Sequence, residues 1–293
     1  RPGRPGQPHG RGAPGEPPRR AATLMAPGAP ATRAPRRKRF GQHFLHDPGV
    51  IERIVRALAP RAGDHLVEIG PGHGALTRHL LGAAGTTLDA IEIDRDLAAR
   101  LRPACAAVPH CQLHESDALE FDFAALARAR GGQLRIVGNL PYNISTPLLF
   151  HLLAQAPALL DLHIMLQREV VARLAACAGN KSYGRLTVML SPWFQIERLF
   201  DVGPGAFQPP PKVWSALVRL TVRAAPLFAV SPHYAALVAA AFSQRRKTLR
   251  NALGAFLTRE QIAACGLDPG ARPETLTPEA FNTLAQALDR ASP

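Results

Sequence analysis

A glycine-rich turn between a strand pattern and a helix pattern constrains the fold of this chain more than any other feature. His65–Ile69 is a short apolar-rich run, Gly70, Gly72 and Gly74 follow it, and Ala75–Leu81 has a helical pattern. Glycines at such a turn let the backbone approach a ligand closely, although the spacing differs from the Gly-x-Gly-x-x-Gly of dinucleotide folds. Taken alone, the run fits a ligand-binding turn and a purely structural turn equally well.

Further apolar runs alternate with helical patterns, which is typical of a doubly wound α/β fold with a parallel sheet. Thr146 and Pro147 predict a helix start, with Thr as the cap and Pro at the first helical position. From about Arg223 the strand pattern ends, which predicts a smaller C-terminal helical domain. Before it we expect strands at Leu88–Ile93, Cys111–Glu115, Leu134–Val137 and Leu162–Leu166, and a closing hairpin from Gln195–Val202 and Trp214–Val222.

Acidic residues stand at the ends of two of these strands. Glu92 lies 22 positions after Gly70, near the spacing at which an acid meets a ribose hydroxyl pair in nucleotide-binding folds. Asp117 follows the next strand, where a carboxylate can accept a hydrogen bond from an adenine amine. Each acid alone also fits a helix cap or a solvated charge. Acids and glycines at successive strand ends together indicate a nucleoside site.

The tetrapeptide Asn139-Leu140-Pro141-Tyr142 directly follows another apolar run. Ligands of open α/β sheets bind outside the carboxyl ends of the strands. The Asn139 side-chain oxygen and the Leu140 carbonyl can accept hydrogen bonds from a nucleobase amine. Pro141 has a fixed φ and biases Leu140 away from a helical backbone, which can hold the Leu140 carbonyl toward the crevice. Tyr142 offers a face on which a base can stack. A strand-to-loop turn with a core tyrosine is the alternative.

Four segments occur in the same order as in a known family. Together they resemble the ribosomal RNA adenine dimethyltransferases, specifically the bacterial small-subunit enzymes, from about Lys38 to the C-terminal end. The resemblance implies a Rossmann-like methyltransferase sheet, S-adenosylmethionine as methyl donor, no metal, and two adjacent adenines near the 3′ end of small-subunit ribosomal RNA as targets, each methylated twice. The segments are Arg39–Leu45, Glu68–Gly72, Gly138–Ser145 and Phe207–Val213.

The resemblance also assigns site residues. Many family members have asparagine where this chain has His43, so His43 can contribute a ring nitrogen or only its backbone. Leu45 and Gly70 are expected to act through their backbones. Phe207 resembles the aromatic residue that sandwiches the target base opposite Tyr142, and the alternative is a core phenylalanine, which is the ordinary meaning of a lone Phe before a proline run. The donor site falls on His43, Leu45, Gly70, Glu92, Asp117 and Asn139, and the catalytic set is Asn139, Leu140, Pro141, Tyr142 and Phe207.

No general base is evident in the sequence, and methyl transfer to an amine does not require one. The amine becomes strongly acidic once it is alkylated, so its proton can leave to water. The protein then mainly aligns the reacting atoms.

The net charge of +13 over 293 residues is unevenly distributed. The first forty residues hold ten of the 35 Lys and Arg residues and a single acid, Glu16. Residues 1–36 are also dense in Pro and Gly, so we expect a disordered tail. Residue 1 is arginine and Met25 precedes the motifs, which leaves open whether residues 1–24 belong to the natural product.

Two basic clusters are candidates for RNA contacts. Arg37, Lys38 and Arg39 stand beside the first motif, where they can meet phosphates. Between residues 238 and 256, the apolar residues recur at helical spacing and predict one buried stripe. Outside that stripe lies a basic helix face, with a solvated surface as the alternative. The stripe is Val238, Phe242, Leu249, Leu253 and Phe256, and the basic face is Arg246, Lys247 and Arg250.

These patterns predict three regions. The tail of residues 1–36 precedes a methyltransferase domain over 37–222, and a helical RNA-binding domain covers 223–293. We expect a monomer that acts on small-subunit ribosomal RNA within a 30S-type assembly intermediate, without a membrane partner.

The cysteines and histidines point to no metal chemistry. The four cysteines have no Cys-x-x-Cys pairing and the histidines have no metal-ligand spacing, so we expect neither a zinc site nor a disulfide framework. Reduced, buried thiols in a cytoplasmic protein are the expectation. The chain shows no apolar stretch for a signal peptide or a membrane span.

Two other functional classes stay open. An adenine methyltransferase of large-subunit RNA or DNA would share the donor site, although DNA enzymes more often have Asp-Pro-Pro-Tyr where this chain has Asn139–Tyr142. A ribosome assembly factor or nucleic-acid-binding protein could use the same fold with methylation lost. The intact glycine turn, acids and tetrapeptide weigh against that loss.

Overall fold

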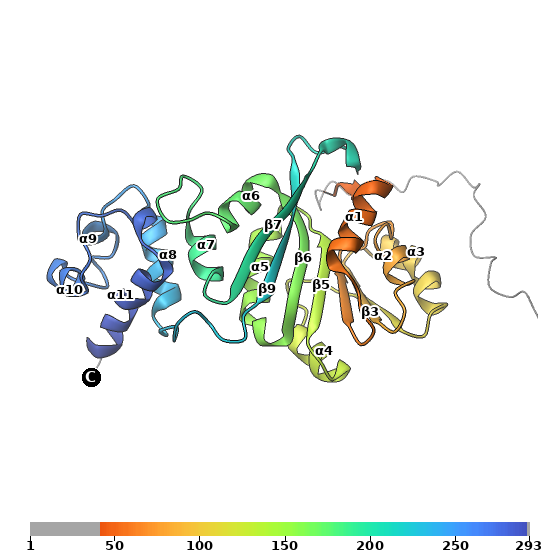
Figure 1. Ribbon diagram of the computed structural model, residues 1–293, viewed down its shortest axis with the longest axis horizontal. Coiled ribbons are helices and arrows are strands. Elements are labelled where there is room, and N and C mark those ends of the chain that lie inside the picture. The colour runs from red at the N-terminus through yellow and green to blue at the C-terminus, as the bar shows by residue number, and fades with distance from the viewer. Residues whose placement is uncertain (1–41, 292–293) are drawn as a thin grey trace, which may run out of the picture. The chain divides into compact units, whose positions relative to one another are not determined.

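The computed structural model describes residues 42–291, and the structural statements below concern this part of the chain. The predictions for residues 1–36 and for Arg37, Lys38 and Arg39 lie outside it. Within it, strands and helices largely alternate as far as Val222, and helices follow (Figure 1). This order agrees with the pattern of the sequence.

One seven-stranded sheet lies at the centre of the described fold. Five neighbouring strands are parallel and the last two join them antiparallel, so the predicted parallel sheet and its closing hairpin are confirmed. In spatial order the strands are β4 (Cys111–Glu115), β3 (Thr87–Glu92), β2 (His65–Ile69), β5 (Leu134–Asn139), β6 (Leu159–Gln167), β9 (Ser215–Val222) and β7 (Phe194–Val202).

Helices pack on both faces of the sheet and form two separate apolar clusters with it. A further helix packs on β4. The first cluster contains residues of α4 (Phe123–Arg130), α5 (Ser145–Ala154), α6 (Arg168–Leu174) and α7 (Arg185–Leu190); the second contains residues of α1 (Pro48–Leu58) and α2 (Thr77–Leu80); the helix on β4 is α3 (Arg95–Ala106).

Successive side chains of the central strands belong alternately to the two clusters. In β2, Leu66 packs with α1 and α2 whereas Val67 belongs to the cluster on the other face. Ile136 and Val137 of β5 divide in the same way. Because side chains alternate across a strand, a strand covered on both faces needs apolar residues at nearly every position. This explains the continuous apolar runs of the sequence.

The strand order reverses between β2 and β5, which lie side by side. The chain passes from β2 to β3 and β4 on one side and then returns to place β5 and β6 on the other. The two strands approach closely at Gly138, where an added Cβ would lie 2.5 Å from the Ile69 carbonyl oxygen. A crevice at the carboxyl ends of such a pair is the usual ligand site of this architecture.

A buried arginine ties the other end of the sheet together. Arg135 of β5 is 8% exposed and donates to both carboxylate oxygens of Asp161 on β6, with Nη2 at 2.9 Å from Oδ2. Its Nη1 donates to Asp64 at 2.6 Å and its Nη2 to the Leu58 carbonyl at 2.7 Å. One guanidinium thus joins β5, β6, the C-terminal end of α1 and the loop before β2.

A small second sheet connects the start of the described chain to the loop between β7 and β9. It pairs β1 (Phe44–Leu45) with β8 (Phe207–Gln208) in antiparallel register. Leu45 and Phe207 are directly opposite each other and belong to the same apolar cluster. The described residues of the first motif, 42–45, are therefore fixed against the proline-rich segment Phe207–Val213.

Helices follow the sheet, as predicted, and form a third apolar cluster that also includes residues of α7 and the loop before it. Buried tyrosines join this cluster by hydrogen bonds: the Tyr234 hydroxyl donates to the Val188 carbonyl at 2.9 Å and the Tyr183 hydroxyl to the Leu276 carbonyl at 2.8 Å. The helices are α8 (Tyr234–Ser243), α9 (Leu249–Ala252), α10 (Arg259–Ala264) and α11 (Pro278–Ala291).

The single helical stripe predicted over residues 238–256 is wrong. Helix α8 ends at Ser243 and α9 begins at Leu249. Between them Thr248 has an extended backbone, with φ −70° and ψ 160°. The Leu249 N–H donates to the Ala271 carbonyl at 2.8 Å, so the chain outside α9 provides a partner for its first turn. Arg246 and Lys247 therefore lie in a turn and not on a helix face.

The predicted helix start at Thr146 is also displaced. Helix α5 begins at Ser145 after Ile144, and the Thr146 side chain does not cap it. Pro147 is the third helical residue. Proline is tolerated there because the N–H groups of the first turn have no partner within the helix.

Within residues 42–291, no helix is both long and apolar enough to cross a membrane.

Candidate active site

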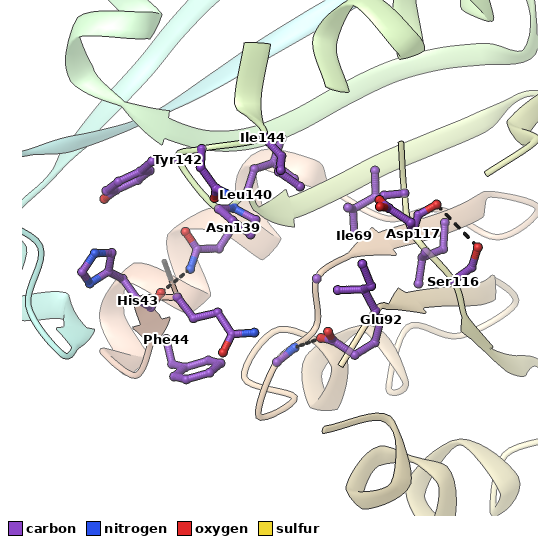
Figure 2. A pocket seen from close by; sticks show the side chains of 18 residues that line it. His43, Phe44, Ile69, Glu92, Ser116, Asp117, Asn139, Leu140, Tyr142 and Ile144 are labelled. Atoms are coloured by element: carbon purple, nitrogen blue, oxygen red, sulfur yellow. Dashed lines mark hydrogen bonds between the residues drawn. The ribbon is translucent and has the colours of Figure 1, made fainter. Parts of the chain in front are cut away.

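A cavity of about 290 Å³ opens at the carboxyl ends of β2, β3, β4 and β5, at the point where the strand order reverses. Figure 2 shows its side chains in two groups, with His43, Asn139 and Tyr142 on one side and Glu92, Ser116 and Asp117 on the other. Most of the residues predicted for the donor and catalytic sites line it, namely His43, Gly70, Glu92, Asp117, Asn139, Leu140, Pro141 and Tyr142.

Glu92 is held at the cavity by backbone donors. Its Oε2 accepts from the Gly72 N–H at 3.0 Å (Figure 2). Its Oε1 accepts from the Asp94 N–H at 2.9 Å. The N-cap residue of α3 is Asp94, so Glu92 does not cap this helix. Burial raises the pKa of Glu92, and the two N–H donors act against that rise. Each carboxylate oxygen has a further lone pair with which to accept a hydroxyl.

The glycine turn lets Glu92 reach this position. Gly72 has φ +58°, and an added Cβ would lie 2.9 Å from the Phe44 ring. A left-handed backbone with a ring against it is accessible to glycine and not to residues with a side chain. The turn therefore brings a backbone N–H to the Glu92 carboxylate and leaves room for Phe44.

Apolar residues and Asp117 form the wall beyond Glu92. Ile69, Ile91 and Ile93 line the cavity, and Ile93 is one of the exposed large apolar residues of the described chain. One oxygen of Asp117 accepts from the Leu119 N–H at 2.9 Å. A planar, amine-bearing ring fits such a wall, with the remaining carboxylate oxygen free to accept from its amine.

Asn139 is fixed in orientation by the chain in front of it. Its Nδ2 donates to the His43 carbonyl at 2.8 Å (Figure 2). The amide oxygen is thereby left as an acceptor at the cavity. The His43 ring is turned elsewhere, because its Nδ1 donates to the Pro209 carbonyl at 2.8 Å. His43 thus presents its backbone at the cavity while its side chain bonds to the Pro209 carbonyl.

The rest of the tetrapeptide is anchored to neighbouring strands. The Leu140 N–H donates to the Met165 carbonyl at 3.2 Å, which continues the pairing of β5 with β6. The Tyr142 hydroxyl is 2.7 Å from the Ser215 hydroxyl at the start of β9. Burial raises the pKa of Tyr142, so the hydroxyl stays protonated at neutral pH. The ring lies 5.5 Å from the His43 ring, centroid to centroid.

Two predicted site residues do not line this cavity. Phe207 is 1% exposed and packs in an apolar cluster with Leu45, so its ring is a core residue in this structure, and its place opposite Tyr142 stays a prediction. Leu45 borders an adjoining hollow of about 30 Å³ together with Glu68. Burial raises the pKa of Glu68 to about 8, so this wall of the hollow is uncharged at neutral pH.

Several cavity residues were not singled out from the sequence. Ile93 follows Glu92, Ser116 precedes Asp117, and Gln42 and Phe44 flank His43. Their only signal in the sequence was that they are neighbours of predicted residues. The apolar residues Ile69, Ile91, Ala118 and Ile144 carry no chemical signature that distinguishes them from core residues.

The basic residues of the C-terminal part lie outside the cavity. Arg246, Lys247 and Arg250 are exposed and fall within five residues of one another. The neighbouring Arg245 donates to the Lys181 carbonyl at 2.6 Å and pairs with Glu274, which fixes the turn that carries Arg246 and Lys247, whereas Arg250 lies in α9.

The described cysteines form no disulfide. All four cysteines are free, but only Cys105 is buried, so the expectation of buried thiols holds for that residue alone. Residues 42–291 contain no group of three or more His, Cys, Asp or Glu side chains arranged to hold a metal ion.

Comparisons with known proteins agree on one family. The profile described as "Ribosomal RNA adenine dimethylase" matches residues 34–290. The chain is 54% identical to Ribosomal RNA small subunit methyltransferase A of Pseudomonas aeruginosa, over 86% of this chain and 94% of that protein. It is 56% identical to the protein of that name from Nitrosococcus oceani, over 85% and 95%.

Two solved structures share the fold. A dimethyladenosine transferase from Plasmodium falciparum superimposes with a TM-score of 0.70 at 24% identity, over 85% of this chain and 98% of that chain. The 23S rRNA methyltransferase ErmE gives a TM-score of 0.64 at 29% identity, over 84% and 99%.

The sheet order, the cavity at its reversal and these comparisons define a Rossmann-like α/β methyltransferase. Within that class, the extent of the profile match and the identity to curated relatives are decisive. The chain belongs to the ribosomal RNA adenine dimethylase family.

Proposed function

We propose that this chain transfers methyl groups from S-adenosylmethionine to the exocyclic amines of two adjacent adenines near the 3′ end of small-subunit ribosomal RNA. The observation that carries the proposal is the fixed orientation of Asn139. Its amide nitrogen is bonded to the His43 carbonyl, so its oxygen is the acceptor at the cavity. Relatives at 54% and 56% identity that are named small-subunit methyltransferases support that substrate over large-subunit RNA.

The cavity suits the donor molecule on chemical grounds. Glu92 has lone pairs for ribose hydroxyls, and the apolar wall with Asp117 suits an adenine ring and its amine. We assign Glu92, Asp117, Gly70 and the backbone of His43 to the donor. S-adenosylmethionine, when bound, supplies an electrophilic methyl group.

The tetrapeptide then prepares the target amine. The Asn139 oxygen and the Leu140 carbonyl accept hydrogen bonds from the amine and draw its lone pair out of conjugation with the ring. Such preorganised groups at a site of developing charge contribute roughly 2.7–4 kcal/mol each. Tyr142 supports the base by stacking, and its hydroxyl bond to Ser215 keeps the ring in place.

The substrate particle and the location complete the proposal. We propose that a monomer acts in the cytoplasm on a 30S-type assembly intermediate, with residues 223–293 as the RNA-binding part. Arg246, Lys247 and Arg250 support such a role because three exposed positive charges lie close together in the sequence.

The direct test is methyl incorporation from labelled S-adenosylmethionine into small ribosomal subunits that lack the adenine dimethylation. Large subunits and duplex DNA serve as controls, and the modified bases are mapped afterwards. We expect four methyl groups on two adjacent adenines near the 3′ end. Tight binding without incorporation would instead support an assembly factor.

Glu92→Ala is expected to weaken the binding of S-adenosylmethionine roughly 30-fold, because hydrogen bonds to a charged acceptor are each worth about 1.5–3 kcal/mol. Calorimetric titration with S-adenosylmethionine and with S-adenosylhomocysteine measures the change. Glu115→Ala, which removes an exposed acid at the end of the neighbouring strand β4, serves as the control and should bind normally. Equal affinities for all three proteins would remove Glu92 from the donor site.

Joint replacement of Arg246, Lys247 and Arg250 by alanine is expected to weaken RNA binding and to reduce the salt slope of log K by roughly 2–3, since each phosphate contact contributes about 0.7–0.9. The matched control removes the same charge from α3 (Arg95, Arg100 and Arg102), where the slope should stay nearly unchanged. A slope that falls equally in both variants would show a general charge effect. Arg246, Lys247 and Arg250 would then be ordinary solvated surface residues.

A further inference from the structure

The largest exposed apolar side chain of the described residues is an indole. Trp214 is 48% exposed and its neighbour Val213 is 44% exposed. Single exposed apolar residues are common on protein surfaces. A tryptophan next to a second exposed apolar residue, directly before a central strand, leaves a larger apolar area in water than such isolated cases do.

This pair lies at the same edge of the sheet as the cavity. Ser215, the next residue, is opposite Gln167 at the end of β6 and Val202 at the end of β7. The Ser215 hydroxyl is also the 2.7 Å partner of the Tyr142 hydroxyl. Since consecutive Cα atoms are about 3.8 Å apart, Trp214 stands one residue away from the anchor of the aromatic wall of the cavity.

One cation lies near the indole ring and a second is close to it in the sequence. The Arg168 N–H donates to the Trp214 carbonyl at 2.9 Å, and its guanidinium carbon lies 5.8 Å from the centre of the ring. The Arg168 side chain is 53% exposed, although one nitrogen lies 4.0 Å from Asp201. Lys212, two residues before the indole, is exposed as well. An aromatic face flanked by cations is the combination that binds single-stranded nucleic acid, because bases stack on the ring while phosphates meet the charges.

We propose that Trp214 is a stacking platform for an unpaired base that flanks the target adenine in the RNA strand. The inference rests on the proposed function, since it takes the occupant of the neighbouring cavity to be an adenine of that strand. Proteins that read single-stranded RNA splay its bases onto aromatic side chains. While one adenine lies beside Tyr142, Trp214 holds a neighbour and Lys212 and Arg168 meet the phosphates between or beside them. Trp214 thereby restricts the substrate to an unpaired segment.

Alanine and phenylalanine variants separate stacking from folding. Trp214→Ala is expected to bind small ribosomal subunits that lack the adenine dimethylation about tenfold more weakly, whereas Trp214→Phe, which keeps an aromatic face, should bind within about threefold of the original protein. The salt slope should be unchanged because no charge is lost. Leu160→Ala is the matched control: Leu160 is 42% exposed but lies at the opposite end of β6 from Gln167.

Fluorescence gives an independent reading. The chain has two tryptophans, so Trp193→Phe leaves Trp214 as the only indole. Titration of this variant with a short single-stranded RNA that contains two adjacent adenines should quench its emission, and duplex RNA of the same sequence should quench it much less.

Normal subunit binding by Trp214→Ala, or emission that RNA does not change, would overturn the platform. The proposed function is tested separately in the unsubstituted protein. If that protein methylates the subunits while Trp214→Ala binds them normally, only the platform is wrong. If the unsubstituted protein neither methylates nor binds them, the proposed function is wrong.

Discussion

Replacement of Asn139 by alanine is expected to lower the rate of methyl transfer about 10²- to 10³-fold, the effect of removing one preorganised group at a site of developing charge. The substitution removes the side-chain amide oxygen that the tetrapeptide presents at the cavity, and with it the bond from Nδ2 to the His43 carbonyl. Affinity for RNA should change by less than about threefold, because phosphate and stacking contacts carry most of that binding.

Single-turnover methyl incorporation into unmethylated small subunits, at saturating donor, measures the rate, and filter binding measures the affinity. Asn143→Ala is the matched control, since Asn143 is an exposed asparagine that lines the same cavity. It should retain transfer within about threefold, because a group without a transition-state contact adds little. A parallel loss of transfer and RNA affinity in Asn139→Ala would show that Asn139 positions the RNA and does not act on the amine.

Arg135→Ala is expected to destabilise the fold by about 3–5 kcal/mol, the cost of removing one partner from a buried ion pair. Asp161 and Asp64 would keep their charges without a cation, and the Leu58 carbonyl would lose its donor. For a chain of this size the melting temperature should fall by roughly 6–20 °C. Arg135→Lys should recover only part of this, because an ammonium cannot form the two parallel bonds to Asp161.

Arg102→Ala, which removes a surface ion pair, is the control for Arg135→Ala. Arg102 pairs with Glu115 on the surface, and its side chain is 59% exposed, so the substitution should cost less than about 1 kcal/mol. Denaturant unfolding of all variants, with circular dichroism as the probe, supplies the free energies. Similar values for the Arg135 and Arg102 variants would exclude the buried network as a determinant of stability.

The sheet could be predicted from the sequence because its strands are covered on both faces. The apolar-rich run His65–Ile69 matches the observed bounds of β2, since an apolar run with glycines behind it is a local feature. Cys111–Glu115 also matches the bounds of β4, although this strand lies at the edge of the sheet and is only partly buried. The convergence of Glu92, Asp117 and Asn139 was also predictable, because the carboxyl ends of neighbouring parallel strands meet at one edge.

Features that depend on distant partners were not visible. Phe207 stands before three prolines, and only its pairing opposite Leu45 shows that the ring is enclosed. Arg135 interrupts an apolar run, and its partners Asp161 and Asp64 lie 26 and 71 positions away.

The break between α8 and α9 was hidden for a different reason. Phe242 and Leu249 are seven positions apart, which fits two turns of one helix as well as two separate helices. The extended backbone of Thr248 and the donation from Leu249 to the Ala271 carbonyl decide between them, and both depend on a segment that packs there from later in the chain.

The bond between Tyr142 and Ser215 also orders events during synthesis. Every described residue that lines the cavity falls between Gln42 and Ile144, so a nascent chain carries all of these groups once residue 144 has been translated. The hydroxyl that anchors Tyr142 belongs to Ser215, 73 positions after Tyr142. During translation the residues assigned to the methyl donor are therefore made before Ser215, which anchors Tyr142. The Tyr142 ring reaches its final position only after Ser215 has left the ribosome.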